Sequence, residues 1–487
     1  MTMQLWAIVP ELILASGFLV LLLMAPFLEG RKAGWVYCSA FLLLAAATFY
    51  TVRMLPWADQ SVFKGTYRLD PLAHFLKFYA FAATTLMLMA CFDYFRDSQY
   101  RSDLPAVLIV TALAGSMLAG SLEISLVVLF FYLLTVGSLI LVGITKQERL
   151  SNEAALKFFV YGSAATAIMI YGLSLFYGVT GSTYVTGRIS GFASSLSPLI
   201  LAVVLVGFGF KLSLAPFHMW APDVYEGAPT PVAGLLSTLP KAAAAAIVLR
   251  FMHGTFANSP TAPIMLEVLA AVSMTVGNLW ALRQTNLKRM LAYSSIAQIG
   301  YVFAAASIAA NHATAYRATL FYLVAYLFMN MGIFLCAARL ELLTGSTDLK
   351  AFGGLWRSAP SLAATTTLFL LSLAGVPPLS GGIAKVLVLE SLAQTTPWLA
   401  VVVGANVVLG AYYYLRVVAA MYLEAQPMSH KPVNSPWLLI AIGLCLSATI
   451  AMGIVPEMLV RYVGTVAPEI THRTLMSDET AGTRWRI

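Results

Sequence analysis

The sequence predicts an all-α, polytopic membrane protein. Hydrophobic residues make up 60% of its 487 residues and charged residues only 10%, and its mean hydropathy is +0.82. Apolar runs of ~20 residues, long enough to cross ~30 Å of hydrocarbon, recur from residue 5 almost to the end of the chain. Lipid offers no hydrogen-bond partners, so each run is expected to be a helix. This composition excludes a set of soluble domains and leaves no room for a soluble catalytic domain.

Fourteen apolar segments are candidate membrane spans. The first contains Glu11, is too long for a signal-peptide core and follows no basic residue, so it is expected to remain as a span. The twelfth is overlong, and 376-VPP-378 and 381-GG-382 interrupt it. The segments are 5–27, 34–53, 71–93, 105–122, 124–145, 154–179, 194–215, 229–252, 262–282, 287–310, 315–338, 360–394, 396–423 and 435–463.

Charge and loop composition predict the orientation. Basic residues gather in the odd-numbered loops, which places those loops in the cytoplasm and both termini outside. The loop 54–70 contains 63-FKGTYRLD-70, whose alternation fits a short extracytoplasmic hairpin. The polar tail 464–487 is expected to be partly mobile. The formal charge of +8 comes from short loops and this tail and is no sign of a nucleic-acid partner.

Cysteine and histidine spacing predicts no cofactor bound by this chain. The four cysteines lie singly in apolar runs, without the close spacing that a metal site or an iron–sulfur cluster requires. The six histidines are also dispersed, and their spacing does not favour a haem-ligating pair.

Three lysines lie well inside apolar segments: Lys211, Lys241 and Lys385. A charged side chain at the bilayer centre costs about 2.5–3.5 kcal/mol on insertion scales, so each is expected to face the interior of the bundle. The alternative is a lysine near a span end that reaches the headgroups, and it is weakest for Lys241, about twelve residues from either end of its span. Burial can shift the pKa of an amine by several units from ~10.4, so a buried lysine suits proton transfer.

Helix breakers accompany these lysines. Pro216, Pro240 and 377-PP-378 remove backbone donors and free carbonyl groups at membrane depth, and broken helices beside buried charges are typical of an ion pathway. The interrupted segments, the seventh and the twelfth, are five spans apart, which predicts two inverted five-helix repeats over spans 4–8 and 9–13. The expected regions are an N-terminal three-helix segment at 1–104, a first repeat at 105–255, a second at 256–425, and a C-terminal helix and tail at 426–487.

Several polar residues near the breaks allow two interpretations each. His218, Asp223 and Glu226 follow the seventh segment, where they either receive protons or cap a cytoplasmic turn. A second group either holds a water chain between Lys241 and Lys385 or makes ordinary interhelical hydrogen bonds. This group comprises Ser294, Ser295, Gln298, Tyr322 and Tyr326.

Three further charged residues have simpler expected roles. Asp70 and Lys77, seven apart on one helical face, fit an ion pair. Lys157, near the cytoplasmic end of the sixth segment, is expected to reach the headgroups.

The stretch 215-APFHMWAPDVYEGAPTPV-232 resembles the antiporter-like subunits of respiratory complex I and their relatives, the multi-subunit sodium/proton antiporters. The resemblance covers nearly the whole chain. Fourteen spans, no long lateral helix, and Lys385 where the M-type subunit typically has glutamate favour the N type. Further matching stretches are 276-VGNLWALRQTNLKRMLAYSSIAQIGY-301, 371-LSLAGVPPLSGGIAK-385 and 411-AYYYLRVVAAMY-422.

The resemblance implies a multi-pass subunit of a proton-translocating NADH-quinone oxidoreductase in the bacterial inner membrane. Quinone, FMN and iron–sulfur clusters would belong to other subunits, and the partners would be an M-type neighbour, the small K-, J- and A-type subunits and the bilayer. By motif position, Lys211 would bind protons in a first half-channel, Lys241 would relay them, and Lys385 would end a second half-channel. The electron donor stays open, because complexes fed by NADH, ferredoxin or other reductants share this module.

One position departs from the family pattern. Family members usually carry a glutamate in the fifth span that pairs with the first lysine, whereas here Leu133 or Leu134 occupies that place. Lys211 is then either coupled differently, through water, Tyr132 or an acid of a neighbouring subunit, or the first half-channel is weakened. The alternatives from other classes are a subunit of a sodium/proton antiporter and a structural subunit with a weakened channel.

Overall fold

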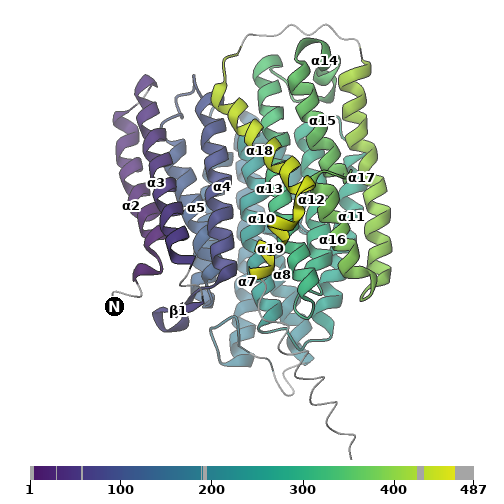
Figure 1. Ribbon diagram of the computed structural model, residues 1–487. Coiled ribbons are helices and arrows are strands. Elements are labelled where there is room, and N and C mark those ends of the chain that lie inside the picture. Colours follow the sequence, from purple (N-terminus) through teal and green to yellow (C-terminus); the bar gives the residue numbers. More distant parts are fainter. Residues whose placement is uncertain are drawn as a thin grey trace, which may run out of the picture.

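The computed structural model describes residues 5–28, 30–55, 59–187, 189, 195–424 and 433–466. It is a bundle of long helices (Figure 1) and confirms the predicted all-α membrane fold. Within the described residues, 10 helices are long and apolar enough to cross a membrane. Three shorter apolar helices are α5 (Leu104–Gly120), α8 (Ser197–Leu212) and α15 (Pro360–Ala374). The number of fourteen crossings and the inverted relation of the two repeats remain predictions.

The N-terminal part contains three long helices and one hairpin. Its elements are α2 (Val9–Met24), α3 (Ala33–Met54), β1 (Gln60–Val62), β2 (Tyr67–Leu69) and α4 (Pro71–Tyr94). The two strands pair antiparallel with Gln60 opposite Leu69, as expected for a short hairpin in the loop 54–70.

The middle of the chain forms the body of the bundle. Its first helices are α5 (Leu104–Gly120), α6 (Ile124–Val142), α7 (Arg149–Thr180), α8 (Ser197–Leu212), α9 (Trp220–Gly227) and α10 (Thr230–His253). The following helices are α11 (Thr261–Ala281), α12 (Leu287–Ala306), α13 (Ala313–Thr344), α14 (Leu355–Ser358), α15 (Pro360–Ala374), α16 (Ser380–Ala393) and α17 (Pro397–Leu423).

The centre of the bundle is α10. Every residue from Thr230 to Met252 is buried, and α4, α5, α8 and α13 pack around the helix. Five consecutive alanines, 242–246, give it little side-chain bulk, which lets neighbouring helices approach closely, as is usual between helices in membranes. Lys241 directly precedes this run and therefore lies in the interior of the protein.

Both expected helix interruptions are present. The helix α8 ends at Leu212, Ser213 adopts the left-handed conformation (φ 58°), and α9 begins at Trp220. The helix α15 ends at Ala374, Gly375 follows with φ 98°, and α16 begins at Ser380. Each break leaves backbone groups without their partners within the helix, as the prolines in the sequence predicted.

The last predicted segment differs from the structure. The single helix expected over 435–463 is two helices, α18 (Pro436–Ile454) and α19 (Pro456–Val466). Pro456 has no amide hydrogen and its ring obstructs the preceding turn, so α18 ends before it. In Figure 1, α18 runs diagonally across the bundle, where it packs on α4, α13 and α16. The tail from residue 467 onwards lies outside the described residues.

The predicted pair of Asp70 and Lys77 is wrong. Asp70 caps α4 and pairs with Arg250 through two 2.7 Å hydrogen bonds, while Lys77 pairs with Glu11 of α2 at 2.9 Å. Seven residues span about 10 Å of helix, too far for direct contact, whereas opposite charges on adjacent helices lie closer. Burial opposes ionisation of Asp70, but the neighbouring Arg250 guanidinium outweighs it and holds the pKa of this carboxyl below its usual range.

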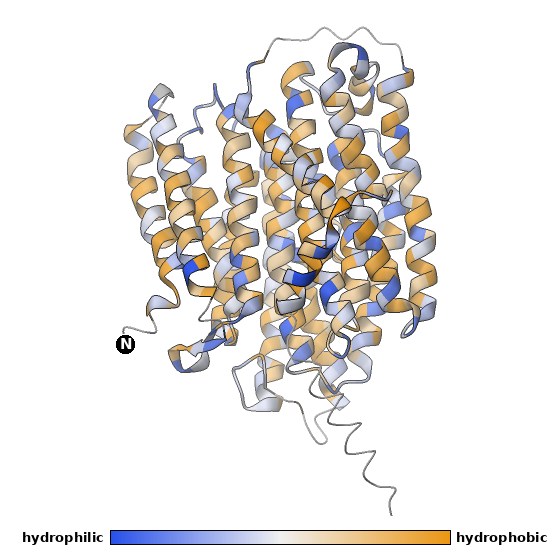
Figure 2. Cartoon of the chain, in the orientation of Figure 1, coloured by the Kyte–Doolittle hydropathy of each residue, from blue (hydrophilic) through white to orange (hydrophobic). Residues whose placement is uncertain are grey.

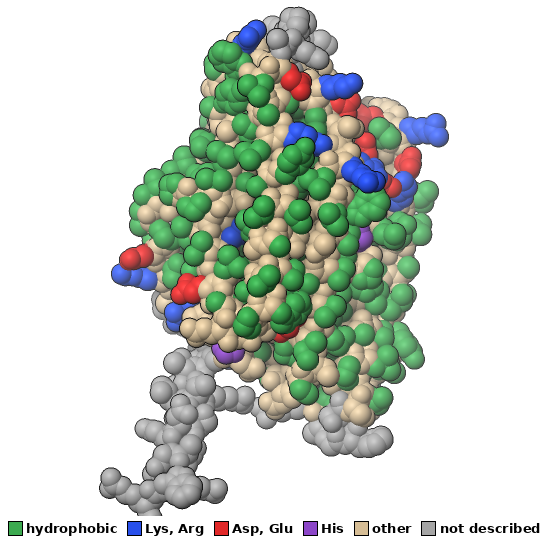
Figure 3. Space-filling view, turned by 90° about the vertical axis from the view of Figure 1, so that its right-hand side faces the viewer, with side chains coloured by type: hydrophobic (Ala, Val, Ile, Leu, Met, Phe, Trp, Pro, Cys, Tyr) green, Lys and Arg blue, Asp and Glu red, His purple; other side chains and the backbone are tan. Residues whose placement is uncertain are grey.

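The outer surface is apolar over most of its height. Figure 2 shows hydrophobic residues along the outer helices, and Figure 3 shows hydrophobic side chains over most of one face, with the charged ones mainly towards its two ends. Large apolar side chains such as Leu23, Val401 and Val408 are more than 70% exposed. An apolar surface of this kind is favourable in contact with lipid and unfavourable in contact with water.

Candidate functional site

The three predicted lysines all lie inside the protein. The relative exposures of Lys211 on α8, Lys241 on α10 and Lys385 on α16 are 2%, 0% and 4%. None reaches the surface, so the alternative of lysines extending to the headgroups does not apply to them. Within the described part of the chain, none of the three makes an ion pair.

Lys211 lies among aromatic rings with one hydroxyl partner. Its ammonium donates a 2.6 Å hydrogen bond to Thr135 Oγ1 of α6 and lies 5.1 Å and 5.6 Å from the ring centres of Phe131 and Phe158. Tyr132, one of the partners expected from the sequence, is 48% exposed and makes no hydrogen bond to Lys211. Thr135 lies one residue beyond Leu134 and two beyond Leu133, the positions at which the resemblance places an acid, and its hydroxyl is the group that contacts Lys211 here.

Glu123 does not replace the missing acid. Its carboxylate caps the start of α6, where it accepts hydrogen bonds from the amides of Ser125 (2.8 Å) and Leu126 (3.2 Å). Glu123 also lies ten residues before Leu133, about 15 Å along a helix. Thr135 was not identified from the sequence. The signal was present, because Thr135 is the first residue with a side-chain hydroxyl after the expected position.

Lys241 contacts a pair of hydroxyl groups. Its ammonium donates to Ser295 Oγ of α12, and Tyr326 of α13 donates to the same oxygen at 2.8 Å. The ring of Tyr225 lies 6.0 Å from the ammonium. Of the polar residues expected near Lys241, Ser295 thus contacts it directly and Tyr326 is linked to it through Ser295.

Lys385 binds the end of the broken helix. Its ammonium donates to the carbonyl oxygens of Leu373 (2.7 Å) and Ala374 (3.0 Å), the last residues of α15. The ring of Tyr301 lies 4.9 Å away. The carbonyl groups at the end of a helix have no partner within it, so the break itself provides the acceptors that this ammonium needs.

A run of hydrogen-bonded side chains leads from Lys385 towards Lys241. The Leu373 carbonyl also accepts from Gln298 Nε2 at 3.0 Å. Gln298 Nε2 lies 3.0 Å from the Tyr414 hydroxyl, which is bonded to Ser294, and Gln298 Oε1 accepts from Tyr322. Ser294 and Ser295 are adjacent on α12, so this run ends one residue from the serine that binds Lys241.

Tyr414 is the member of this run that sequence analysis missed. It is one of three consecutive tyrosines, of which Tyr412 is 63% exposed while Tyr413 and Tyr414 are buried. Only packing decides which of the three rings faces inward.

The space between Lys211 and Lys241 is different, because rings fill it. Trp220 contacts Phe158 and Tyr225, with ring centres 4.9 Å and 6.0 Å apart, and its indole nitrogen donates to the carbonyl of Phe210 at 2.9 Å. Over the part of the chain that the structure describes, no series of hydrogen bonds joins the two lysines.

The acids that follow the first break form ion pairs. Asp223 pairs at 2.7 Å with both Lys157 and Arg289, and Glu226 pairs with Arg289 at the same distance, which ties α9 to α7 and α12. A hollow of about 150 Å³ lies beside them. His218 is half-buried and makes no hydrogen bond or ion pair with these two acids. Lys157, expected to reach the headgroups, is instead held by Glu153 and Asp223.

The described residues offer no group of three or more His, Cys, Asp or Glu side chains that could hold a metal ion. The four cysteines are separate from one another, with no disulfide among them.

A bundle with two broken helices, each beside a buried lysine, and a third lysine on a central helix defines an antiporter-like membrane subunit. The model of the family described as "NADH:quinone oxidoreductase/Mrp antiporter, TM" matches residues 121–410. The chain is 34% identical over 483 residues to NADH-quinone oxidoreductase subunit N of Desulfitobacterium hafniense, covering 94% of this chain and 96% of the relative. It is 36% identical over 477 residues to subunit N of Geobacillus kaustophilus, covering 92% and 94%. The chain belongs to the family of NADH-quinone oxidoreductase subunit N, a membrane subunit of complex I.

Solved structures agree with this assignment. A chain of respiratory complex I from Thermus thermophilus superposes with a TM-score of 0.81 at 31% identity, over 94% of this chain and 99% of that one. A chain of the Mrp complex from Dietzia sp. superposes with a TM-score of 0.83 at 18% identity, over 95% and 97%, which shows a shared fold alone.

Proposed function

We propose that this chain translocates protons through Lys211, Lys241 and Lys385, coupled to quinone reduction in partner subunits of complex I. One observation carries the proposal: Lys241 and Lys385 lie at the two ends of a buried, nearly continuous run of polar side chains. Apolar side chains would fill the same space at a lower free-energy cost, so a purely structural role does not account for this run.

The chemistry of the run suits proton transfer. A hydroxyl group both donates and accepts hydrogen bonds, so Ser295 could take a proton from Lys241 and pass its own to the oxygen of Tyr326, once the Tyr326 hydroxyl has turned to accept it. The Leu373 and Ala374 carbonyls favour the ammonium form of Lys385 when it is loaded. A buried ammonium without a counter-ion is sensitive to nearby charge, so charge displacement in an adjacent subunit would load or release its proton.

The remaining expectations complete the proposal. Residues 105–255 and 256–425 would form the first and second half-channels. The chain would lie in a bacterial inner membrane with its N-terminus outside, between an M-type neighbour and the small K-, J- and A-type subunits. The redox groups, FMN and iron–sulfur clusters, and the site of quinone reduction would belong to other subunits of the complex. His218, Asp223 and Glu226 would lie on the cytoplasmic side of the first half-channel.

The test is proton uptake by vesicles that contain the purified complex. Proton uptake that starts only when an electron donor and a quinone are added supports the proposal. Uptake driven by a sodium gradient without a donor would instead identify a sodium/proton antiporter subunit. The proposal would be contradicted if quinone reduction drove the same proton uptake after Lys211, Lys241 and Lys385 were replaced.

One observation favours a second candidate, a subunit with a weakened first half-channel. Lys211 has a hydroxyl partner, and aromatic rings separate it from Lys241. In that case protons would pass mainly through the Lys241–Lys385 half of the chain.

A further inference from the structure

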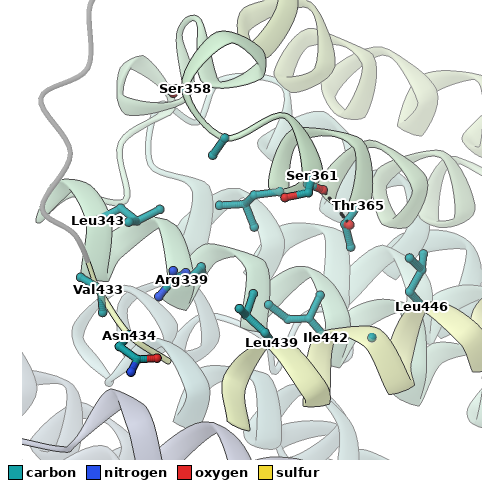
Figure 4. Close-up of a pocket in the computed structure, with 13 residues that line it drawn as sticks. Arg339, Leu343, Ser358, Ser361, Thr365, Val433, Asn434, Leu439, Ile442 and Leu446 are labelled. Atoms are coloured by element: carbon teal, nitrogen blue, oxygen red, sulfur yellow. Dashed lines mark hydrogen bonds between the residues drawn. The ribbon is translucent and has the colours of Figure 1, made fainter. Parts of the chain in front are cut away.

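We propose that a groove between α13, α15 and α18 binds one anionic phospholipid, with its phosphate at Arg339 and an acyl chain along α18. The groove has a volume of about 660 Å³ and opens on the outer surface of the bundle (Figure 4). It is distinct from the buried lysines and the polar run between them, since none of those residues lines it.

The diagonal course of α18 creates the groove. Because α18 crosses the long helices at an angle, it separates from α15 along part of its length. Gly443 widens the gap, because a Cβ atom built there would meet no atom within 4 Å. Leu439, Ile442 and Leu446 of α18 form one wall (Figure 4), and Leu362 of α15 also lines the groove. From Leu439 to Leu446 the wall is about 10 Å long, enough for part of an acyl chain.

One end of the groove is polar and positively charged. Arg339 of α13 is half-buried there, and among the described residues its side chain donates one hydrogen bond, to Ser435. No described carboxylate lies within ion-pair distance of it. The acid that acts on it electrostatically, Asp93, is itself paired with Arg96 at 3.0 Å and accepts the amide of Leu438. A guanidinium has five N–H donors, so most of those of Arg339 remain for a ligand.

The start of α15 adds to the positive potential. The helix α15 begins at Pro360, and its second and third residues, Ser361 and Leu362, line the groove. The start of α18 makes no such contribution, because Pro436 has no N–H group and the amide of Leu438 is bonded to Asp93. Helix N-termini carry a partial positive charge and unpaired N–H groups, which suits a phosphate oxygen.

A phospholipid matches the combination of an apolar wall and a cationic end, because it carries both an acyl chain and a phosphate. The groove joins an apolar wall that faces the hydrocarbon to a cationic end beside the loop that precedes α15, which is expected to be cytoplasmic. Basic residues near the cytoplasmic surface attract anionic lipids. A second groove of about 670 Å³ on the other side of α18 is lined by Phe78, Phe81 and Leu444, among others, and by no charged residue. It serves as an internal comparison, since it has room for a chain and no group to select a headgroup.

The experiment uses p-benzoylphenylalanine as a photocrosslinker at two positions of α18 in the assembled complex. Leu446 lines the first groove and Ala448, two residues on, lines the second. The complex is reconstituted with phosphatidylcholine and phosphatidylglycerol in a ratio of about four to one, and the mass of each adduct identifies the lipid. We expect phosphatidylglycerol adducts at Leu446 to be enriched about fivefold over their share of the bilayer, and adducts at Ala448 to follow the bulk composition.

Two further variants separate charge from space. Arg339→Gln should remove the enrichment at Leu446, while Arg339→Lys should keep most of it. Gly443→Leu keeps Arg339 and fills the groove, so it should lower all lipid adducts at Leu446 and leave those at Ala448 unchanged. Quinone reduction by each variant complex checks assembly.

Three outcomes would overturn the proposal. The first is a peptide adduct at Leu446, whether the peptide comes from a neighbouring subunit or from this chain. The second is phosphatidylglycerol enrichment at Leu446 that persists in Arg339→Gln. The third is equal phosphatidylglycerol enrichment at Leu446 and Ala448.

Discussion

Lys211 and Lys385 each lie beside a helix break, Lys211 on the helix before it and Lys385 on the helix after it, and their surroundings differ. The ammonium of Lys211 has one hydroxyl partner, Thr135, and two aromatic rings beside it. The ammonium of Lys385 has two carbonyl partners, one of which it shares with Gln298 of the polar run. The comparison indicates that a break in a helix does not by itself make a pathway, because the neighbouring helices must also supply polar side chains.

The largest expected effect comes from removing each lysine in turn. Lys385→Ala should lower proton uptake per electron donor oxidised by at least about tenfold, the scale typical of lost proton-transfer groups. If the first half-channel is weakened, Lys211→Ala should change proton uptake per electron donor oxidised by less than about twofold. Proton uptake and quinone reduction are measured on the same vesicles. An equal loss in the two variants would reject the weakened first half-channel.

The two breaks should also differ in their tolerance of added volume. A Cβ atom at Gly381 would collide with the carbonyl oxygen of Ser372, a backbone atom, whereas at Gly209 it would meet the ring of Phe217. A ring can move and a backbone carbonyl cannot, so Gly381→Ala should destabilise the protein by about 1–3 kcal/mol and Gly209→Ala by less. The measurements are the yield of assembled complex and its thermal stability. Greater damage from Gly209→Ala would contradict this interpretation.

Breaking the polar run should have an intermediate effect. Gln298→Leu removes hydrogen bonds to Leu373, Tyr322 and Tyr414. If the loss of this link raises the barrier to proton transfer by ~1 kcal/mol, the net worth of one hydrogen bond, proton uptake should fall about fivefold. Asn406→Leu is the matched control, because Asn406 is a buried amide whose side chain bonds to Asn278 and Thr275, neither of which belongs to the run. Similar losses in both variants would mean that packing, and not the run, explains the effect.

The smallest effect is expected at Thr135. Thr135→Val keeps the shape of the side chain and removes the only hydrogen-bond partner of Lys211 among the described residues. With a weakened first half-channel, proton uptake should change by about twofold or less, while Thr135→Ser should behave like the original protein. A tenfold loss in Thr135→Val alone would show that this hydroxyl replaces the missing glutamate in function.

The fold was predictable from the sequence where the signal is local. Long apolar runs, prolines and glycines mark where helices cross and break, and the interruptions near Pro216 and 376-VPP-378 were placed correctly. The expectation of one helix over 435–463 was wrong, although Pro456 was a visible warning. Hydropathy outweighed a single proline in that interpretation.

The partners of each charge were much harder to predict. Spacing along one helix suggested a pair of Asp70 and Lys77, but each pairs across the bundle, with Arg250 and Glu11. Likewise, Thr135 and Tyr414 came to light only with the structure, because either could have faced lipid in a helix rotated by a fraction of a turn.

The sequence by itself determined the membrane class of this protein, its broken helices and the burial of the amines of Lys211, Lys241 and Lys385, because burying charge and breaking a helix in lipid are costly wherever they occur. Only the tertiary structure decided which groups surround each amine. Contacts between helices depend on how each helix is rotated and tilted against its neighbours, and that arrangement is set by packing over the whole bundle.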